Sequence, residues 1–113
     1  MASDYVIALG SVSGITLSSG DTMEVLNGGT AISTAILDGG LLTVSSGGSA
    51  TSTSIHSGGS AIIESGGSAI FASIDSGGVE TVMAGAVTEN VLVFGELDVD
   101  GGAGDLDYVS DIF

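Results

Sequence analysis

The sequence predicts an all-β protein, a parallel β-helix (β-solenoid) of about five 19-residue coils. The first observation is a series of glycine pairs whose spacing alternates between 11 and 8 residues, so that the pattern repeats every 19 residues. The second is that positions 19 residues apart carry the same type of side chain. The third is the composition, which combines 20 glycines and 43% apolar residues with no proline. A fixed period of this length is typical of a chain built from stacked copies of one small unit.

The charge of the chain excludes several classes of partner. Its 113 residues, enough for one domain, include 14 acidic residues, one histidine and no lysine or arginine, which gives a net charge of −14. Without cations the chain is not expected to bind nucleic acid through its phosphates or to dock on an anionic membrane leaflet. No stretch approaches the ~20 apolar residues of a membrane helix, so membrane insertion is not expected. The absence of cysteine excludes disulfides and thiolate metal sites.

Residues 1–19 are predicted to form a degenerate N-terminal coil. They lack the basic region and the uninterrupted apolar stretch that together make a Sec signal peptide. Two explanations stay open. Either the sequence is a piece of a longer protein, or it leaves the cell by a route that needs no N-terminal signal, for which type I secretion is the candidate.

Residues 20–95 are predicted to form the glycine-pair β-solenoid, with two turns and two extended segments in each repeat. Two sets of positions 19 residues apart are aliphatic throughout, as an inward-facing ladder requires. They read Leu17, Ile36, Ile55, Ile74, Val93 and Val25, Val44, Ile63, Val82. A third set stays small and predicts a narrow part of the coil: Val12, Ala31, Ala50, Ala69, Thr88. The set Leu37, His56, Asp75 has no common character, which is typical of solvent-facing positions.

The glycine pairs are expected to form the turns, because glycine adopts the positive φ values that a Cβ disfavours. The predicted turn glycines are Gly28, Gly29, Gly39, Gly40, Gly47, Gly48, Gly58, Gly59, Gly66, Gly67, Gly77 and Gly78. A related pair, Gly85-Ala86, continues the series.

The body of the repeat reads SGGSATSTSIHSGGSAIIE from Ser46 to Glu64, and the motif SGGSA occurs three times. These residues resemble the AIDA-type repeat of autotransporter adhesin passengers, over roughly residues 20–95. The resemblance implies a right-handed β-helix at the cell surface of, or secreted by, a Gram-negative bacterium, with roles in adhesion, autoaggregation and biofilm. It also implies sugars on repeat serines, for which Ser52, Ser54 and Ser57 are the candidate acceptors.

Residues 96–113 are predicted to form an acidic C-terminal coil or tail. The stretch from Asp98 to Asp107 is similar to a calcium-binding RTX nonapeptide, although Leu106 stands where the motif requires an acid. Calcium prefers carboxylate oxygens, so the candidate ligands are Asp98, Asp100, Asp105 and Asp107. A solvated acidic tail is the alternative. The last residues are also similar to the acidic-then-hydrophobic endings of type I secretion substrates.

Neither end of the chain carries the proline, lysine or amphipathic helix that commonly protects a terminal strand edge. We therefore expect copies of the chain to associate head to tail, which generates an open filament. The residues expected at this junction are Tyr5, Val6, Ile7, Leu9, Leu106, Tyr108, Val109, Ile112 and Phe113. Truncation of a longer array of repeats is the alternative explanation of the open ends.

No catalytic site is predicted. His56 is expected to lie about 5 Å from Asp75 on the next coil, but nothing indicates the oriented base and oxyanion hole of a serine hydrolase. Glu64 and Glu80 belong to different sets of equivalent positions, and each is too isolated for paired acid–base chemistry.

An ice-binding array of threonines is also not expected. The motif Thr51-x-Thr53 would have to recur on every coil, and its equivalents are Ile32/Thr34 and Ile70/Ala72. The leading hypothesis is a non-catalytic extracellular structural protein that self-associates head to tail into fibres or a surface or biofilm matrix. The alternative is an adhesin fragment that binds a host or bacterial surface glycan or protein.

Overall fold

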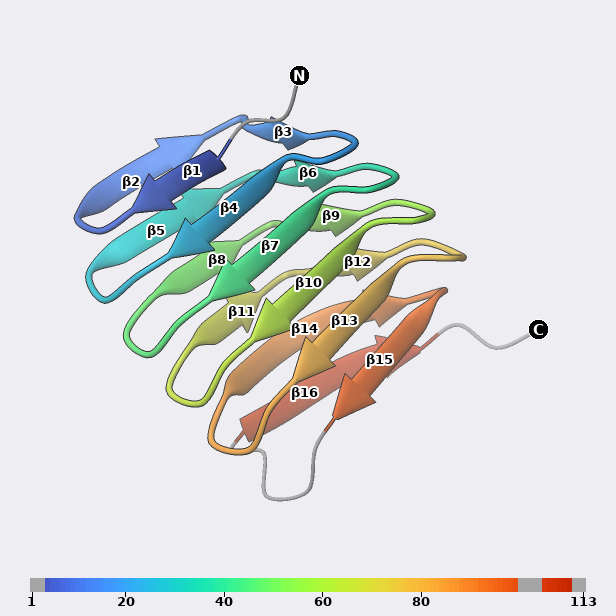
Figure 1. Cartoon of the computed structure of the whole chain (residues 1–113). Coiled ribbons are helices and arrows are strands. Elements are labelled where there is room, and N and C mark those ends of the chain that lie inside the picture. The colour runs from blue at the N-terminus through green and yellow to red at the C-terminus, as the bar shows by residue number, and fades with distance from the viewer. Residues whose placement is uncertain (1–3, 100–104, 111–113) are drawn as a thin grey trace.

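The computed structural model describes the backbone of residues 4–99 and 105–110, and the side chains of residues 4–89 and 91–95. The chain forms a parallel β-solenoid of about five coils, in which each strand pairs with the equivalent strand of the next coil (Figure 1). Followed downward from the N-terminus in Figure 1, the chain crosses the front from right to left and returns behind from left to right, which makes the solenoid right-handed. The predicted fold class is confirmed.

Each of the first four coils contains three strands. The first contains β1 (Asp4–Ile7), β2 (Gly10–Ser13) and β3 (Thr16–Leu17), and the second β4 (Thr22–Val25), β5 (Gly29–Ile32) and β6 (Ala35–Ile36). The third contains β7 (Leu41–Val44), β8 (Ser49–Thr51) and β9 (Ser54–Ile55), and the fourth β10 (Ser60–Ile63), β11 (Ser68–Ile70) and β12 (Ser73–Ile74). The fifth contains β13 (Val79–Val82) and the long β14 (Val87–Val93), beneath which β15 (Glu96–Val99) and β16 (Asp105–Ser110) are stacked.

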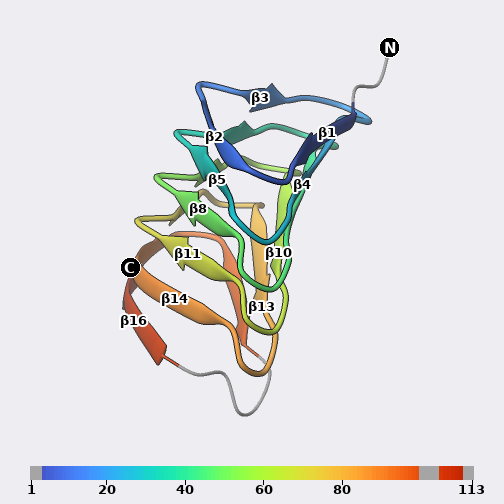
Figure 2. The same cartoon turned by 90° about the vertical axis from the view of Figure 1, so that its left-hand side faces the viewer.

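The strands form two parallel sheets. The first sheet has the order β1-β4-β7-β10-β13-β15, and the second contains the remaining strands, joined through β14, which pairs with β11, β12 and β16. Figure 2 shows β5, β8, β11 and β14 on one side of a turn edge and β4, β10 and β13 on the other. Leu41 pairs with Ser60, and Ser60 with Val79, so the 19-residue sequence period is the register of stacking.

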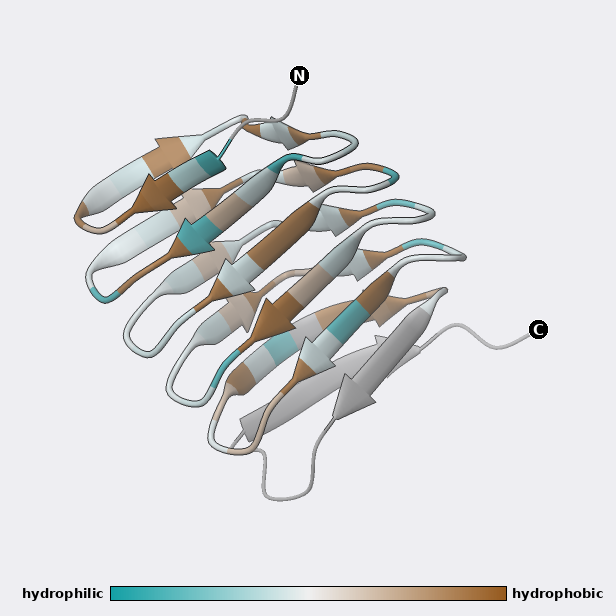
Figure 3. Cartoon of the chain, in the orientation of Figure 1, coloured by the Kyte–Doolittle hydropathy of each residue, from teal (hydrophilic) through white to brown (hydrophobic). Residues whose placement is uncertain are grey.

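The core consists of the residue sets predicted to point inward. Leu17, Ile36, Ile55 and Ile74 are fully buried, and so are the members of the valine-rich set between Val25 and Val82. The small set Ala31, Ala50 and Ala69 is buried as well. The inward orientation of these sets is confirmed, although Val12, the first member of the small set, is only partly buried. In Figure 3 the strands carry most of the hydrophobic colour, whereas the loops at the two edges are mostly pale or teal.

The two glycines of a pair have different reasons to be glycine. The first adopts a positive φ, for example 89° at Gly28 and 86° at Gly39, in a turn that the next residue closes with an i to i+3 hydrogen bond. The second makes a close approach to the coil above, because a Cβ on Gly40 would lie 2.6 Å from the carbonyl oxygen of Leu17. The glycine corners also bond to one another, since the Gly39 N–H donates to the Gly58 oxygen at 3.1 Å.

A third corner, which the glycine pattern did not predict, separates the two strands of the second sheet in each of the first four coils. Instead of two extended segments, the repeat therefore has three. The corner residues Gly14, Ser33, Ser52 and Phe71 all have positive φ, between 56° and 74°. Their N–H groups continue the ladder, as in the bond from Ser33 to the carbonyl oxygen of Thr51 at 2.9 Å. The corner left little trace in the sequence because its residue type changes from coil to coil, although glycine adopts a positive φ more easily than serine or phenylalanine.

The last corner of the fifth coil is shorter than its predecessors. Val79 pairs with Glu96, a separation of 17 residues (96 − 79) where the regular coils have 19. The sequence explains the difference, because Phe94-Gly95 stands where the fourth coil has Asp75-Ser76-Gly77-Gly78. Two turn residues are missing, and the chain bends through Gly95, where a Cβ would lie 2.6 Å from the Gly78 carbonyl oxygen.

Candidate functional surfaces

The one histidine lies on the outer surface and joins two coils. His56 Nδ1 lies 2.9 Å from Asp75 Oδ2, and the two side chains are 43% and 47% exposed. The predicted contact between neighbouring coils is therefore confirmed. Among the described side chains, no serine hydroxyl is bonded to His56, so the geometry provides an inter-coil tie and not a proton relay.

Glu80, in contrast to His56 and Asp75, is buried. Its carboxyl group lies inside the solenoid, and the residue is 1% exposed. The Thr88 hydroxyl, also buried, donates a hydrogen bond of 3.2 Å to Glu80 Oε2. Burial raises the pKa of Glu80 from 4.5 to about 7, and the bond from Thr88 partly opposes this rise. A carboxyl group with this pKa holds its proton in mild acid and loses it above neutrality.

The sequence contained a signal for this buried acid. Glu80 is equivalent to Met23, Leu42 and Ala61, which point into the core. Glu80 is the acidic member of this set, and it pairs with the small Ala61 in the coil above. Glu80 was considered above only for acid–base chemistry with Glu64, and its burial was not predicted.

Two buried threonines also interrupt the apolar core. Thr34 and Thr53 are 1% and 3% exposed, and their hydroxyl groups have no hydrogen-bond partner. They are equivalent positions on successive coils, on the core side just after the serine corners. Because Thr53 points inward, the Thr51-x-Thr53 motif does not form the flat outer array that ice binding would require.

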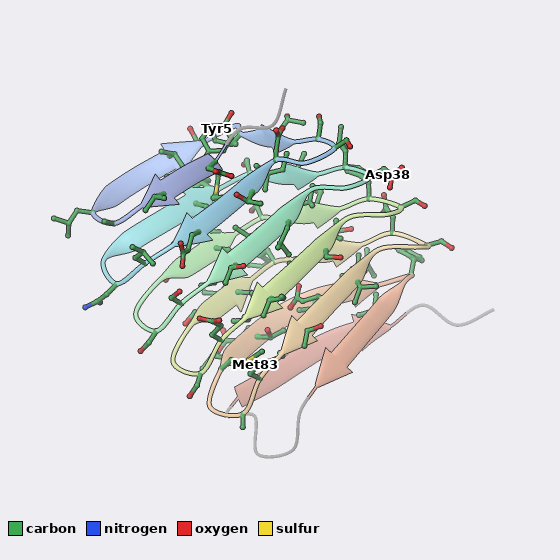
Figure 4. All side chains as sticks on the ribbon, in the orientation of Figure 1. Tyr5, Asp38 and Met83 are labelled. Carbon is green, nitrogen blue, oxygen red and sulfur yellow. The ribbon has the colours of Figure 1, made fainter. Side chains whose placement is uncertain are left out.

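The edges of the solenoid carry the polar and mixed side chains. Figure 4 labels Asp38 at one turn edge, Met83 close to the other and Tyr5 in the first coil. Of the predicted candidate sugar acceptors, Ser52 and Ser57 are exposed and Ser54 is half-buried.

The predicted junction residues of the first coil divide into two groups. Ile7 is buried and Tyr5 packs partly against the core, whereas Val6 and Leu9 are 61% and 86% exposed. At the other end, Leu106, Tyr108 and Val109 lie in β16, which pairs with β14, and only their backbone is described. Ile112 and Phe113 lie outside the described residues. Head-to-tail contact between copies therefore stays a prediction.

The side chains of the four predicted calcium ligands lie outside the described ones. Asp98 lies in β15 and Asp105 and Asp107 in β16, where the backbone alone is described, and Asp100 lies outside the described residues. Elsewhere, in the part of the chain that was described, no three histidine or acidic side chains gather closely enough to hold a metal ion. Calcium binding stays a prediction.

Exposed apolar side chains gather at the C-terminal end of the second sheet. Phe71 is 57% exposed, Leu92 37% and Phe94 41%, and we call these three residues the Phe71 patch. They lie on adjacent coils, because the Leu92 N–H bonds the carbonyl oxygen of Ala72 and the Phe94 N–H that of Ile74.

Within residues 4–99 and 105–110 there is no helix long and apolar enough to span a membrane.

Comparison with known proteins places the repeats in a wider context. A sequence model of the family described as adhesin of the bacterial autotransporter system, probable stalk, matches residues 2–59, just over half of the chain. A search of curated proteins found no significant match. Among solved structures, the crystal structure of a hyper-glycosylated TibA fragment, glycosylated by TibC, superimposes with a TM-score of 0.53 at 21% identity. The alignment covers 97% of this chain and 63% of that fragment. Because the identity is only 21%, the likeness supports the fold alone.

Proposed function

The chain belongs to the AIDA family, the adhesins of the bacterial autotransporter system, within their probable stalk, and on this premise we propose that it acts as a stiff spacer that holds an adhesive surface away from the cell. Its role is non-catalytic, and its place is the surface of a Gram-negative bacterium. The resemblance found in the SGGSA repeats is thus confirmed. The family is one of autotransporters, and nothing supports the type I secretion expected from the sequence.

The observation that carries the spacer proposal is the unbroken stacking of coils. Strand ladders, glycine corners and serine corners are all hydrogen-bonded from one coil to the next, so every side of the solenoid is tied along its axis. Each coil adds ~4.8 Å of length. A stalk of this kind changes its length by whole coils without changing its cross-section.

Insertion of whole and partial coils tests the spacer. A second copy of residues 47–65 should lengthen the particle by about 4.8 Å, measured by small-angle scattering, and should leave the circular dichroism spectrum β-rich. The matched control is a second copy of residues 47–57, because 11 residues shift every following side chain out of its set. If both insertions give equally stable β-structure, stacking in register does not hold the stalk together.

Self-association is the second function that we propose, with fibres or a biofilm matrix as its product. β1 pairs only with β4, and β15 only with β13, among the described strands, so each terminal coil presents backbone groups that a further coil could bind. That coil would belong either to a longer chain or to a second copy. Val6 and Leu9 give the first coil an exposed apolar surface beside this edge.

Lysine substitutions on the first coil test this contact. A charged side chain at an edge strand opposes pairing, so the double variant Val6→Lys/Leu9→Lys should remain monomeric in sedimentation at concentrations where the unchanged chain forms filaments. Ser57→Lys, at an exposed turn in the middle of the solenoid, is the control and should leave assembly unchanged. Filaments of equal length from all three proteins would show that the first coil is not the junction.

Binding of a surface glycan or protein by the flat faces is the alternative to self-association. In either case the solved relative suggests a modification, because that fragment is hyper-glycosylated. We propose Ser52 and Ser57, both exposed, as acceptors before the half-buried Ser54. Intact mass spectrometry of the chain purified from its natural host would detect the added mass of sugars, and an unmodified mass would remove this proposal.

A further inference from the structure

We propose that the Phe71 patch is a docking surface for a basic protein segment that carries both cationic and apolar side chains. The proposal begins with the backbone of Phe71. Its φ of 59° lies in the left-handed region, which is a genuine exception for a bulky residue. Equivalent positions in the earlier coils carry Gly14, Ser33 and Ser52, which are small. Burial does not explain the phenylalanine either, because its side chain is 57% exposed.

Leu92 and Phe94, the other two residues of the Phe71 patch, are also larger and more apolar than their equivalents in the third and fourth coils. Leu92 is equivalent to Ala35, Ser54 and Ser73, and Phe94 to Leu37, His56 and Asp75. The small or polar residues that the third and fourth coils carry at these two positions are therefore replaced by large apolar ones in the fifth. Three large apolar residues exposed on adjacent coils, on one side of a sheet, mark an interaction surface and not a scattered background.

Charge decides what kind of partner fits this surface. Asp75 is equivalent to Phe94 in the coil above and is 47% exposed, and the chain carries a net charge of −14 with no lysine or arginine. A second copy of the chain would bring the same negative charge to the contact. A partner with lysine or arginine would instead gain attraction to the acidic surface, and its cations could also lie on the exposed phenylalanine rings. Apolar side chains of the same segment would cover Leu92.

Three synthetic heptapeptides separate charge from apolar contact. The first alternates lysine with phenylalanine, the second lysine with serine, and the third glutamate with phenylalanine. Amide chemical shifts of the isotope-labelled 113-residue chain report where each peptide binds. We expect the lysine–phenylalanine peptide to shift the amides of Phe71, Leu92 and Phe94, the lysine–serine peptide to bind far more weakly, and the glutamate–phenylalanine peptide not to bind.

Phe71→Ser is the informative variant, because it restores the residue of the equivalent corners and should fold at least as well as the unchanged chain. It should weaken binding of the lysine–phenylalanine peptide about tenfold, as expected for a central aromatic contact. Ile32→Ser removes another exposed apolar residue, from the second coil, and is the control, with unchanged affinity.

Several outcomes would overturn the proposal. Equal binding of the two lysine peptides, with shifts spread over all acidic residues, would mean attraction to net charge alone. Unchanged affinity of Phe71→Ser would remove the patch from the contact. A dimer of the unchanged chain that Phe71→Ser converts to a monomer would identify a second copy as the occupant in place of a basic partner.

Discussion

Replacement of Glu80 by glutamine should change how the stability of this solenoid depends on pH. The carboxyl group is 1% exposed, and burial raises its pKa from 4.5 to about 7. The folded chain therefore binds the proton more tightly than the unfolded chain does. Below about pH 4.5 both states are protonated, and the stability is fully present. As the pH rises through about 7, the folded state is left with an ionised carboxylate in the core, and stability is lost.

The size of this loss follows from the shift in pKa. Each pKa unit corresponds to roughly 1.4 kcal/mol, so a rise from 4.5 to about 7 corresponds to about 3 kcal/mol between mild acid and alkaline pH. Glutamine keeps the shape of the side chain and can still accept a hydrogen bond from Thr88, but it carries no charge at any pH. The difference in stability between Glu80→Gln and the unchanged chain should therefore grow in favour of the variant from pH 5 to pH 8.

Urea denaturation followed by circular dichroism at pH 5, 6, 7 and 8 measures this difference. The other acidic residues also repel one another as the pH rises, and subtraction of the two profiles removes their contribution. Glu64→Gln is the matched control, because it deletes a half-buried surface carboxylate that accepts a bond from Ser45 and leaves Glu80 in place. Its profile should keep the slope of the unchanged chain. Parallel profiles for Glu80→Gln and the unchanged chain would refute the reasoning.

Three further predictions concern the core and the acidic end. Ile55→Asp should abolish the β-rich circular dichroism spectrum, because it buries an unpaired carboxylate between two isoleucines, whereas His56→Asn at the neighbouring surface position should preserve it; equal losses would contradict the assignment of inward sets. Thr53→Val should leave thermal stability unchanged or raise it, by up to about 1–2 kcal/mol, since the hydroxyl has no partner to lose; a clear loss in thermal denaturation would reveal a bond to buried water. Millimolar calcium should raise the melting temperature if the acidic end binds it, and Asp100→Asn with Asp105→Asn should remove the effect; calorimetry without heat or thermal shift would leave the solvated tail.

Much of this fold could be predicted from sequence because a solenoid turns sequence period into spatial contact. Once the period is 19 residues, Ile55 must stack between Ile36 and Ile74, and His56 must meet Asp75 on the next coil. Both expectations hold in the structure, with the second contact at 2.9 Å. Glu80 is equivalent to Met23, Leu42 and Ala61, so the same period also places its side chain in the core.

What the sequence by itself determined was the stacking: the glycine pairs, the period, the inward sets and the family resemblance all depend on residues that recur at fixed intervals. Only the tertiary structure decided the features that do not repeat as a residue type. The third corner uses serine, glycine or phenylalanine, so it is defined by a shared backbone conformation and not by composition. The raised pKa of Glu80 and the exposure of Phe71 likewise depend on what surrounds each side chain. Burial is a property of the assembled coils, and a period can align residues without stating how the chain bends between them.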